Sequence, residues 1–332
     1  MQVLNQKLND ILAPVQSEIE ALDSRLINEI SPSSRALCHI LQEIFKAGGK
    51  RLRPALSFLI AKAIKPQKPI LEQVYLIAEI SELIHTASLV HDDIIDNSFL
   101  RRGQPTANSK WDNAITVISG DFMFARAAVN LGKLGENQIT TLFAQVLEDL
   151  CDGEIRQVEK KFSTEIDWDY YYSKSHKKTG SLIEAACVAP AIYYQADPKV
   201  ILACSLFGRN LGLAFQIIDD ILDFNSTTES MGKPALSDLK DGNITIPILY
   251  ALEDPLCSDL IKEKIIHISN SAYDSVLEEV SVILKQCLAI EKSFIKAREL
   301  VDIGISSLNI LPESSAKQSL IDLADYVLSR TN

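Results

Sequence analysis

A helical pattern runs through residues 71–97, which read LEQVYLIAEISELIHTASLVHDDIIDN. Apolar side chains recur there three and four positions apart, as at Val74, Ile77 and Ala78. Because that spacing gathers them on one face of an α-helix, the stretch predicts a long amphipathic helix. Its end is acidic, since the last residues read HDDIIDN from His91 to Asn97.

The same spacing recurs along most of the chain, and alternating strand patterns are nearly absent. We therefore expect an all-α protein. No shift in composition and no linker separates one part of the chain from another, which favours a single domain over residues 1–332. Besides 71–97, the pattern predicts helices over 110–133, 137–160, 169–194 and 198–224, with shorter ones in 258–330.

Composition excludes several classes of protein. The chain has 332 residues, 47% of them hydrophobic, which is too apolar for a disordered protein. A net charge of −11 argues against nucleic acid as a partner. Six scattered cysteines form no C-x-x-C pair, so neither a zinc site nor a disulfide framework is expected. Apolar runs are too short for a transmembrane segment, and the N-terminus does not resemble a signal peptide.

Two copies of a D-D-x-x-D motif stand in apolar surroundings, HDDIID ending at Asp96 and IDDILD ending at Asp223. Helical spacing places Asp92 and Asp96 on one face, and likewise Asp219 and Asp223. Like charges at that spacing repel, and carboxylates among core residues need a compensating cation. A solvated acidic patch or a helix cap could explain one copy, but the recurrence favours a site for Mg²⁺, which accepts few carboxylates and keeps positions for phosphate oxygens.

Basic clusters accompany these acids in an otherwise acidic chain. The first, GGKRLRP over 48–54, comes at the expected start of a helix, where backbone N–H groups also favour anions. The others are Arg101-Arg102, Lys177-Lys178 and Lys233. Any one of them could be a solvated surface. Together with two metal-type motifs they predict a diphosphate site.

These segments, taken in order, resemble the trans-isoprenyl diphosphate synthases. The resemblance rests on GGKRLRP, HTASLVHDDIIDNSFLRRGQPT, KKTG, FQIIDDILDF and GKPALSDLKDGN, and it covers nearly the whole chain. The C-terminal ADYVLSR is similar to the long-chain, solanesyl-type branch. The resemblance implies a helical bundle around a central substrate cavity (the isoprenoid synthase fold), a homodimer, and Mg²⁺-dependent condensation of isopentenyl diphosphate with an allylic diphosphate.

The resemblance also assigns roles to individual residues. Asp92, Asp96 and Asp219 would bind Mg²⁺ directly, and Asp223 would do so through water. The allylic diphosphate would be held by Arg101, Lys178 and Lys233, while the oxygens of Thr179 and Gln216 would face the allylic cation. Isopentenyl diphosphate would bind Lys50, Arg53, His85 and Arg102.

Several of these residues have an ordinary alternative. Without the family resemblance, His85 would be interpreted as a hydrogen-bonded histidine of the core, and Gln216 as a buried amide that joins two helices. Arg51 is expected to face away from its basic neighbours. The chain departs from many short-chain members at Asn243, where those carry a lysine, so diphosphate binding is expected to depend more on Lys233 and Lys240.

The length of the product is expected to depend on the helix before Asp92. Ala87, Ser88 and Ile84 would line the path of the growing chain, and no aromatic residue lies between Tyr75 and Asp92. This predicts a long, solanesyl-like product for a quinone side chain. The alternatives are a geranylgeranyl or other shorter-chain synthase, a terpene cyclase, and a non-catalytic partner subunit. We expect a soluble protein of the cytoplasm or plastid stroma that associates with membranes through its apolar product.

Overall fold

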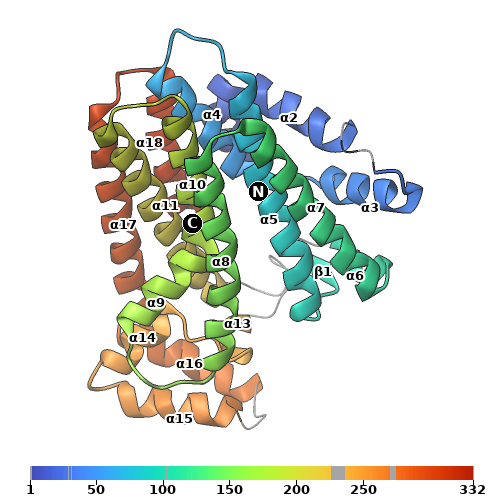
Figure 1. Ribbon diagram of the computed structural model, residues 1–332. Coiled ribbons are helices and arrows are strands. Elements are labelled where there is room, and N and C mark those ends of the chain that lie inside the picture. The colour runs from blue at the N-terminus through green and yellow to red at the C-terminus, as the bar shows by residue number, and fades with distance from the viewer. Residues whose placement is uncertain are drawn as a thin grey trace. The chain divides into compact units, whose positions relative to one another are not determined.

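The computed structural model describes residues 2–28, 30, 32–101, 104–225, 236–269 and 274–331. Most of these residues are helical, which confirms the expected all-α fold (Figure 1). In this described part, the strands are β1 (Leu100–Arg101) and β2 (Gln104–Pro105), which pair antiparallel directly after the first aspartate motif.

Contacts between Cα atoms divide the chain into two compact units, each made of separate stretches of sequence. The first comprises Met1–Leu147, Leu182–Gly208 and Ile305–Leu323, and the second comprises Glu148–Ser181, Arg209–Gly304 and Ala324–Asn332. The motif with Asp92 belongs to the first unit, and the motif with Asp219 belongs to the second.

In the first unit, α5 (Glu72–Ile95) packs against α4 (Leu52–Ile64) and α7 (Asn113–Leu134). Its apolar positions Val74, Ile77 and Ile80 are fully buried, as the spacing predicted. The unit also contains α1 (Gln2–Leu12), η1 (Ala13–Val15), α2 (Gln16–Asn28), α3 (Arg35–Lys46), α6 (Ala107–Lys110), η3 (Leu308–Ile310), and all of α10 (Ser181–Tyr193) except its first residue.

In the second unit, α9 (Trp168–Ser175) continues into a five-residue π-helix, His176–Gly180, before α10 begins. The sequence predicted one uninterrupted helix over 169–194, because apolar spacing does not distinguish a π-turn from an α-turn. The unit also contains α13 (Ser237–Lys240), α14 (Ile246–Glu253), α15 (Ser258–Ser269), α16 (Asp274–Gln286) and η4 (Ser329–Thr331).

The remaining long helices contribute residues to both units. They are α8 (Asn137–Glu159), α11 (Pro198–Asn225), α17 (Ala289–Ser307) and α18 (Ser315–Leu328). The bounds of α5, α7, α8 and α11 agree with the expected helices to within a few residues. Two helical stretches, Asn113–Leu134 and Pro198–Phe224, are long and apolar enough to cross a membrane, a test that the core helices of soluble proteins also pass.

Candidate active site

The first aspartate motif lies at the C-terminal end of α5. Asp92 is half-buried, whereas Asp96 is exposed and is the C-cap residue of the helix. The negative end of the helix dipole and the neighbouring carboxylate both make the electrostatic environment at these positions negative. The pair therefore favours a bound cation.

The middle residue of this motif has a structural role. Asp93 is 5% exposed and accepts a hydrogen bond of 2.8 Å from Arg101 Nε, while its backbone oxygen accepts from Asn108. Arg101 was predicted to hold the allylic diphosphate. Its Nε is bound to Asp93, so this ion pair anchors the arginine to the motif.

The three basic residues at the start of α4 differ in how exposed their side chains are. Lys50 is exposed and Arg53 is half-buried. Arg51 is only 6% exposed, and its guanidinium lies 2.6 Å from both Asp23 and Glu82. Burial alone would lower the pKa of Arg51, but these two carboxylates raise it above its ordinary value. Arg51 therefore faces the interior of the first unit, away from any substrate that Lys50 and Arg53 bind.

The second aspartate motif lies near the C-terminal end of α11. Asp219 Oδ1 is 2.9 Å from Arg330 Nη2, and the Arg330 guanidinium stacks over the ring of Phe215 at 4.5 Å. Sequence reasoning used Arg330 only as the last letter of ADYVLSR, because nothing in one chain pairs a C-terminal arginine with a distant aspartate. The structure shows that the proposed metal ligand has a cation beside it.

Asp220 is the centre of a buried hydrogen-bond network that the sequence analysis did not single out. Its carboxylate is 2% exposed and accepts bonds from Tyr171 Oη at 2.7 Å, Gln216 Nε2 at 2.9 Å and Ile246 N at 3.3 Å. Burial raises the pKa of Asp220, against the opposing charge of Lys174 and these donors.

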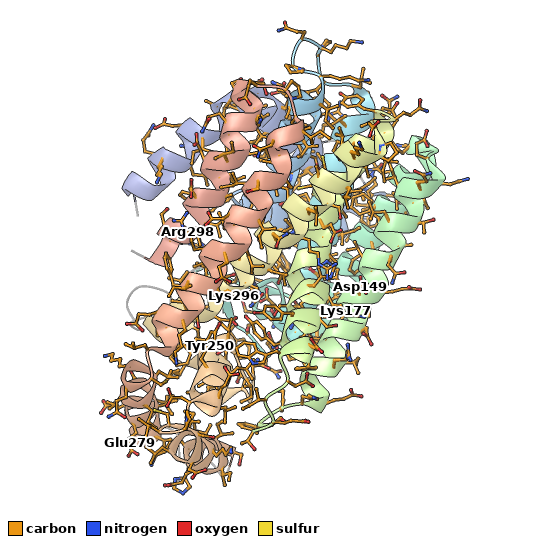
Figure 2. All side chains as sticks on the ribbon, turned by 90° about the vertical axis from the view of Figure 1, so that its left-hand side faces the viewer. Asp149, Lys177, Tyr250, Glu279, Lys296 and Arg298 are labelled. Atoms are coloured by element: carbon orange, nitrogen blue, oxygen red, sulfur yellow. The ribbon has the colours of Figure 1, made fainter. Side chains whose placement is uncertain are left out.

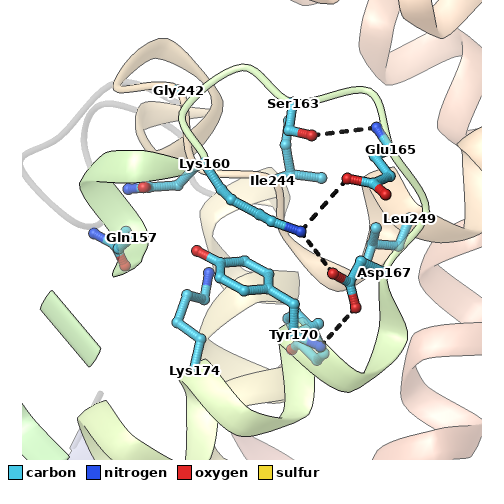
Figure 3. Close-up of a pocket in the computed structure, with 12 residues that line it drawn as sticks. Gln157, Lys160, Ser163, Glu165, Asp167, Tyr170, Lys174, Gly242, Ile244 and Leu249 are labelled. Carbon is cyan, nitrogen blue, oxygen red and sulfur yellow. Dashed lines mark hydrogen bonds and ion pairs between the residues drawn. The ribbon is translucent and has the colours of Figure 1, made fainter. Parts of the chain in front are cut away.

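Lys174 is a second buried charge beside this network. Its side chain is 8% exposed, and burial lowers the pKa of its ammonium group, while the nearby Asp220 and Asp238 act in the opposite direction. Figure 3 shows Lys174 next to Tyr170 in a small pocket of about 20 Å³, room for roughly one water molecule. A lysine in a mixed polar run of sequence gave no signal of this burial.

Asp223 caps a short helix. Its Oδ1 accepts bonds from the backbone and side chain of Ser237, at 3.1 and 2.7 Å, and its Oδ2 accepts from Asp238 N at 3.2 Å. The predicted contact of Asp223 with metal through water stays a prediction. In this structure both oxygens fix the start of α13.

Thr179 and Gln216, which the resemblance paired in function, are joined by a hydrogen bond of 2.7 Å from Thr179 Oγ1 to Gln216 Oε1. The helices carrying them approach very closely, because a Cβ atom on Gly212 would lie 2.6 Å from Gly180 Cα. Thr179 sits in the π-helix, a feature that often marks functional sites. Two glycines thus allow the contact that brings this pair together.

The lysines before Thr179 are held by acidic residues of α8. Lys178 Nζ is 2.6 Å from Glu154 Oε2 and 3.2 Å from Gln157 Oε1. Lys177 pairs with Asp152 at 2.6 Å and with Asp149 at 3.3 Å, and Figure 2 shows Lys177 next to Asp149. These carboxylates orient the two ammonium groups before any substrate binds.

Other predicted residues are placed as follows. Arg102 and Lys233 lie outside the described residues. Lys240 is exposed, and the buried Oδ1 of Asn243 has no hydrogen-bond partner. On α5, His85 and Ser88 are half-buried, while Ile84 and Ala87 are fully buried.

The donors of the two motifs suit a hard divalent cation. Among the described residues, no group of three or more His, Cys, Asp or Glu side chains is arranged to hold a metal. Mg²⁺ does not need such a cage, because it binds one or two carboxylates and completes its shell with water and phosphate oxygens. Asp92 and Asp96 in the first motif, and Asp219 in the second, supply carboxylate oxygens of that kind, so the donors of each motif fit such an ion.

Comparison with known proteins agrees with the resemblance seen in the sequence. The family model "Polyprenyl synthetase" matches residues 34–283. A solanesyl diphosphate synthase of Arabidopsis thaliana chloroplasts is 36% identical over 327 residues, which cover 97% of this chain and 77% of that protein.

Solved structures agree in fold along almost the full chain. Heptaprenyl diphosphate synthase of Staphylococcus aureus superposes with a TM-score of 0.90 at 31% identity, covering 96% of this chain and 99% of that one. A polyprenyl synthase of Caulobacter crescentus, in complex with calcium and isoprenyl diphosphate, gives 0.88 at 26% identity, covering 98% of each chain.

Proposed function

The chain belongs to the polyprenyl synthetase family, and from this premise we propose the reaction, the cation and the residues that carry them. The protein is a prenyltransferase, a trans-polyprenyl diphosphate synthase with a long-chain product. The observation that carries this function is the presence of both aspartate motifs at helix ends, together with the hydrogen-bonded pair of Thr179 and Gln216.

The chemistry proceeds by ionisation, condensation and elimination. The C1–O bond of the allylic diphosphate breaks, and diphosphate leaves with the electron pair. The double bond of isopentenyl diphosphate attacks the resulting cation, and C4 forms the new carbon–carbon bond. A proton is then lost from C2, and the released diphosphate accepts it.

The cation is Mg²⁺; Asp92 and Asp96 would hold such an ion at the first motif, and Asp219 would do so at the second. When bound, it neutralises the negative charge that develops on the leaving diphosphate. The half-buried and exposed positions of these carboxylates support the proposal, since they leave oxygens accessible to an ion. The calcium complex of the Caulobacter synthase supports a divalent cation in a relative.

The basic residues divide between the two substrates. Lys178, Arg101 and Lys233 hold the allylic diphosphate, while Lys50, Arg53, His85 and Arg102 hold isopentenyl diphosphate. Lys178 and Arg101 support this role because each is anchored by a carboxylate, Glu154 or Asp93, and so is oriented before the substrate arrives. The oxygens of Thr179 and Gln216 face the allylic cation.

One assay tests the proposed function. Purified protein is incubated with isopentenyl diphosphate, a short allylic diphosphate and Mg²⁺, and both diphosphate release and prenyl chain length are measured. We expect Mg²⁺-dependent release with chain extension, lost with a chelator. Release without extension would indicate a terpene cyclase, and no release would indicate a non-catalytic partner subunit. A product of four isoprene units would indicate a geranylgeranyl synthase.

The protein acts as a homodimer, with the exposed apolar face of α7 at the interface. On α7, Ile115, Ile118 and Val129 are 40%, 59% and 50% exposed, and helical spacing puts them on one side. An exposed apolar stripe of this kind is typical of an association surface. Light scattering coupled to gel filtration should give the mass of a dimer, and Ile118→Lys should reduce it toward that of one chain.

The chain works as a single domain, residues 1–332, of the cytoplasm or plastid stroma. Support for one domain comes from the dividing points between the two compact units, which fall inside helices and not in linkers, namely in α8, α10, α11, α17 and α18. The family model also spans both units without a break. The chloroplast enzyme of Arabidopsis supports a plastid location.

A further inference from the structure

A chain of hydrogen bonds connects the buried Asp220 to the pair that faces the allylic cation. Asp220 Oδ1 accepts from Gln216 Nε2, and Gln216 Oε1 accepts from Thr179 Oγ1. Because an ionised carboxylate can only accept, the Gln216 amide must turn its nitrogen to Asp220 and its oxygen to Thr179. The orientation of the catalytic amide is therefore set by Asp220.

Asp220 is in turn held from its other side. Tyr171, 1% exposed, donates to Oδ2 at 2.7 Å, which leaves Oδ1 for Gln216. Ile246 N also donates to Oδ2, at 3.3 Å. Without the Tyr171 donor, Oδ2 would lose its shortest bond and keep only the longer one from Ile246 N, so the carboxylate would be held less firmly.

Lys174 supplies the charge that this arrangement needs. An ionised carboxylate that is 2% exposed is costly without a neighbouring cation, and the buried Lys174 ammonium comes from the same helix as Tyr171, whose hydroxyl donates to Asp220. The same ammonium is 5.8 Å from the centre of the Tyr171 ring. Both groups come from α9, one helical turn apart, so a single element supports Asp220 twice.

We propose that Tyr171 and Lys174 are positioning residues of the condensation reaction, which hold Asp220 and through it direct the oxygens of Gln216 and Thr179 to the allylic cation. The inference rests on the proposed function, because it gives a purpose to the orientation of that pair. It adds two residues that touch neither substrate nor metal. Replacing either residue should lower the stabilisation of the transition state without weakening the binding of the two diphosphates.

The first experiment removes the hydroxyl group of Tyr171 and keeps its aromatic ring. Tyr171→Phe should lower kcat about tenfold, while KM for each substrate stays within about twofold of wild type, because only the cation-facing dipoles lose their orientation. Tyr172→Phe is the matched control. It is the next residue on α9, its ring packs against Tyr171, and it should keep wild-type kcat.

The second experiment measures coupling, which a merely structural role would not produce. In a Gln216→Leu background, Tyr171→Phe should lower kcat less than about twofold, because the amide that Tyr171 helps to orient is gone. An equal tenfold loss in both backgrounds would overturn the proposal. So would a rise in KM that accounts for the lost activity, or wild-type kcat in Tyr171→Phe.

Lys174 is tested in the same way. Lys174→Met should lower kcat in the wild-type background and change it little in an Asp220→Asn background, where no charge remains to be balanced. Lys160→Met, which removes a lysine paired with Asp167 in the same pocket, is the control. Equal losses in both backgrounds would overturn the role of Lys174. Inactive wild-type protein would overturn the proposed function and this inference with it, whereas active wild-type and variant proteins would overturn this inference alone.

Discussion

Asp93 and Asp220 occupy the same position in the two D-D-x-x-D motifs, and both are buried, but their partners differ in kind. Asp93 pairs with a cation, Arg101, that comes from the hairpin next to it. Asp220 instead accepts from a phenol of α9, a backbone N–H of α14 and an amide one turn earlier on its own helix. The first motif is thus supported locally, and the second is supported by tertiary structure.

The last aspartates of the motifs differ as well. Asp96 is exposed at the end of α5, whereas Asp223 is 9% exposed and fixes the start of α13 through Ser237 and Asp238. The same sequence pattern therefore places corresponding aspartates in different structural roles. In the first motif the outer carboxylates of Asp92 and Asp96 are half-buried and exposed, and in the second the carboxylate of Asp219 is more exposed than that of Asp223.

The largest expected effect tests what the motifs share. Asp92→Ala and Asp219→Ala should each lower kcat by about three orders of magnitude or more, because losing a metal-held contact to the leaving group removes several kcal/mol of transition-state stabilisation. Steady-state kinetics at saturating Mg²⁺ would show this. Near-normal turnover in Asp219→Ala would show that the second motif is structural and does not share the metal-binding role of the first.

The next effect tests where the motifs differ. Asp96→Ala should lower kcat roughly a hundredfold with an unchanged melting temperature. Asp223→Ala should instead destabilise the fold by about 1–3 kcal/mol, because it leaves donors of Ser237 and Asp238 without their acceptor. Parallel kinetic assays and chemical unfolding of the two variants would separate these outcomes. Equal losses of stability would show that Asp96 also has a structural role.

The helix of the first motif should also set the length of the product. Ser88→Phe should give a shorter prenyl chain and still permit the first condensation, since the aromatic ring closes the path one turn below Asp92. Ser88 is half-buried, so it tolerates the change better than the fully buried Ala87, where Ala87→Tyr should shorten the product at a cost of about 1–3 kcal/mol in stability. Mass spectrometry of the products decides. Unaltered length in both variants would show that this face does not line the path.

A smaller effect concerns the cation beside the second motif. Arg330→Gln should lower the Mg²⁺ concentration for half-maximal activity about two- to fivefold, because a partly exposed ion pair contributes only a fraction of a kcal/mol to about 1 kcal/mol. Arg298→Gln, which breaks an exposed pair with Asp325, is the control and should leave that concentration unchanged. A higher Mg²⁺ requirement in Arg330→Gln would mean that Arg330 assists binding and does not compete with it.

The smallest effect is a pH dependence confined to the second motif. Burial raises the pKa of Asp220 above its ordinary value of 3.8. The folded state then binds the proton more tightly, so this residue's contribution to the free energy of unfolding falls as pH rises from 3.8 through the raised pKa. Relative to Asp220→Asn, wild type should lose stability across that window and run parallel to the variant above it. Thermal unfolding across a pH series would measure the difference, and a constant difference at all pH values would contradict it.

The fold and the acidic motifs were accessible from sequence because they depend on local periodicity. The end of α5 at Ile95 and the burial of Ile77 follow from apolar spacing and from the residues that break helices. The family resemblance also identified Thr179 and Gln216. The π-helix and the contact of Gly180 with Gly212 join them in space. Both features depend on how two helices pack, so neither segment predicts them by itself.

The same reasoning explains why several other residues were missed. Asp220 looked redundant between two proposed metal ligands, yet its burial and its bond to Tyr171 make it the centre of the network. Arg51 was expected to face away from its basic neighbours, and it does, but the sequence could not identify Asp23 and Glu82 as the carboxylates that hold it. Pairings between distant residues of this kind need a fold before they can be recognised.

The contact between Gly180 and Gly212 has a consequence for how the gene can vary. A single methyl group on Gly212 would meet a backbone atom at 2.6 Å, and backbone, unlike a flexible side chain, cannot move aside alone. Gly132 offers the opposite case, because nothing lies within 4 Å of the Cβ it lacks. In a library of random variants selected for activity, codon 132 should therefore drift freely, while codon 212 should be recovered almost always as glycine.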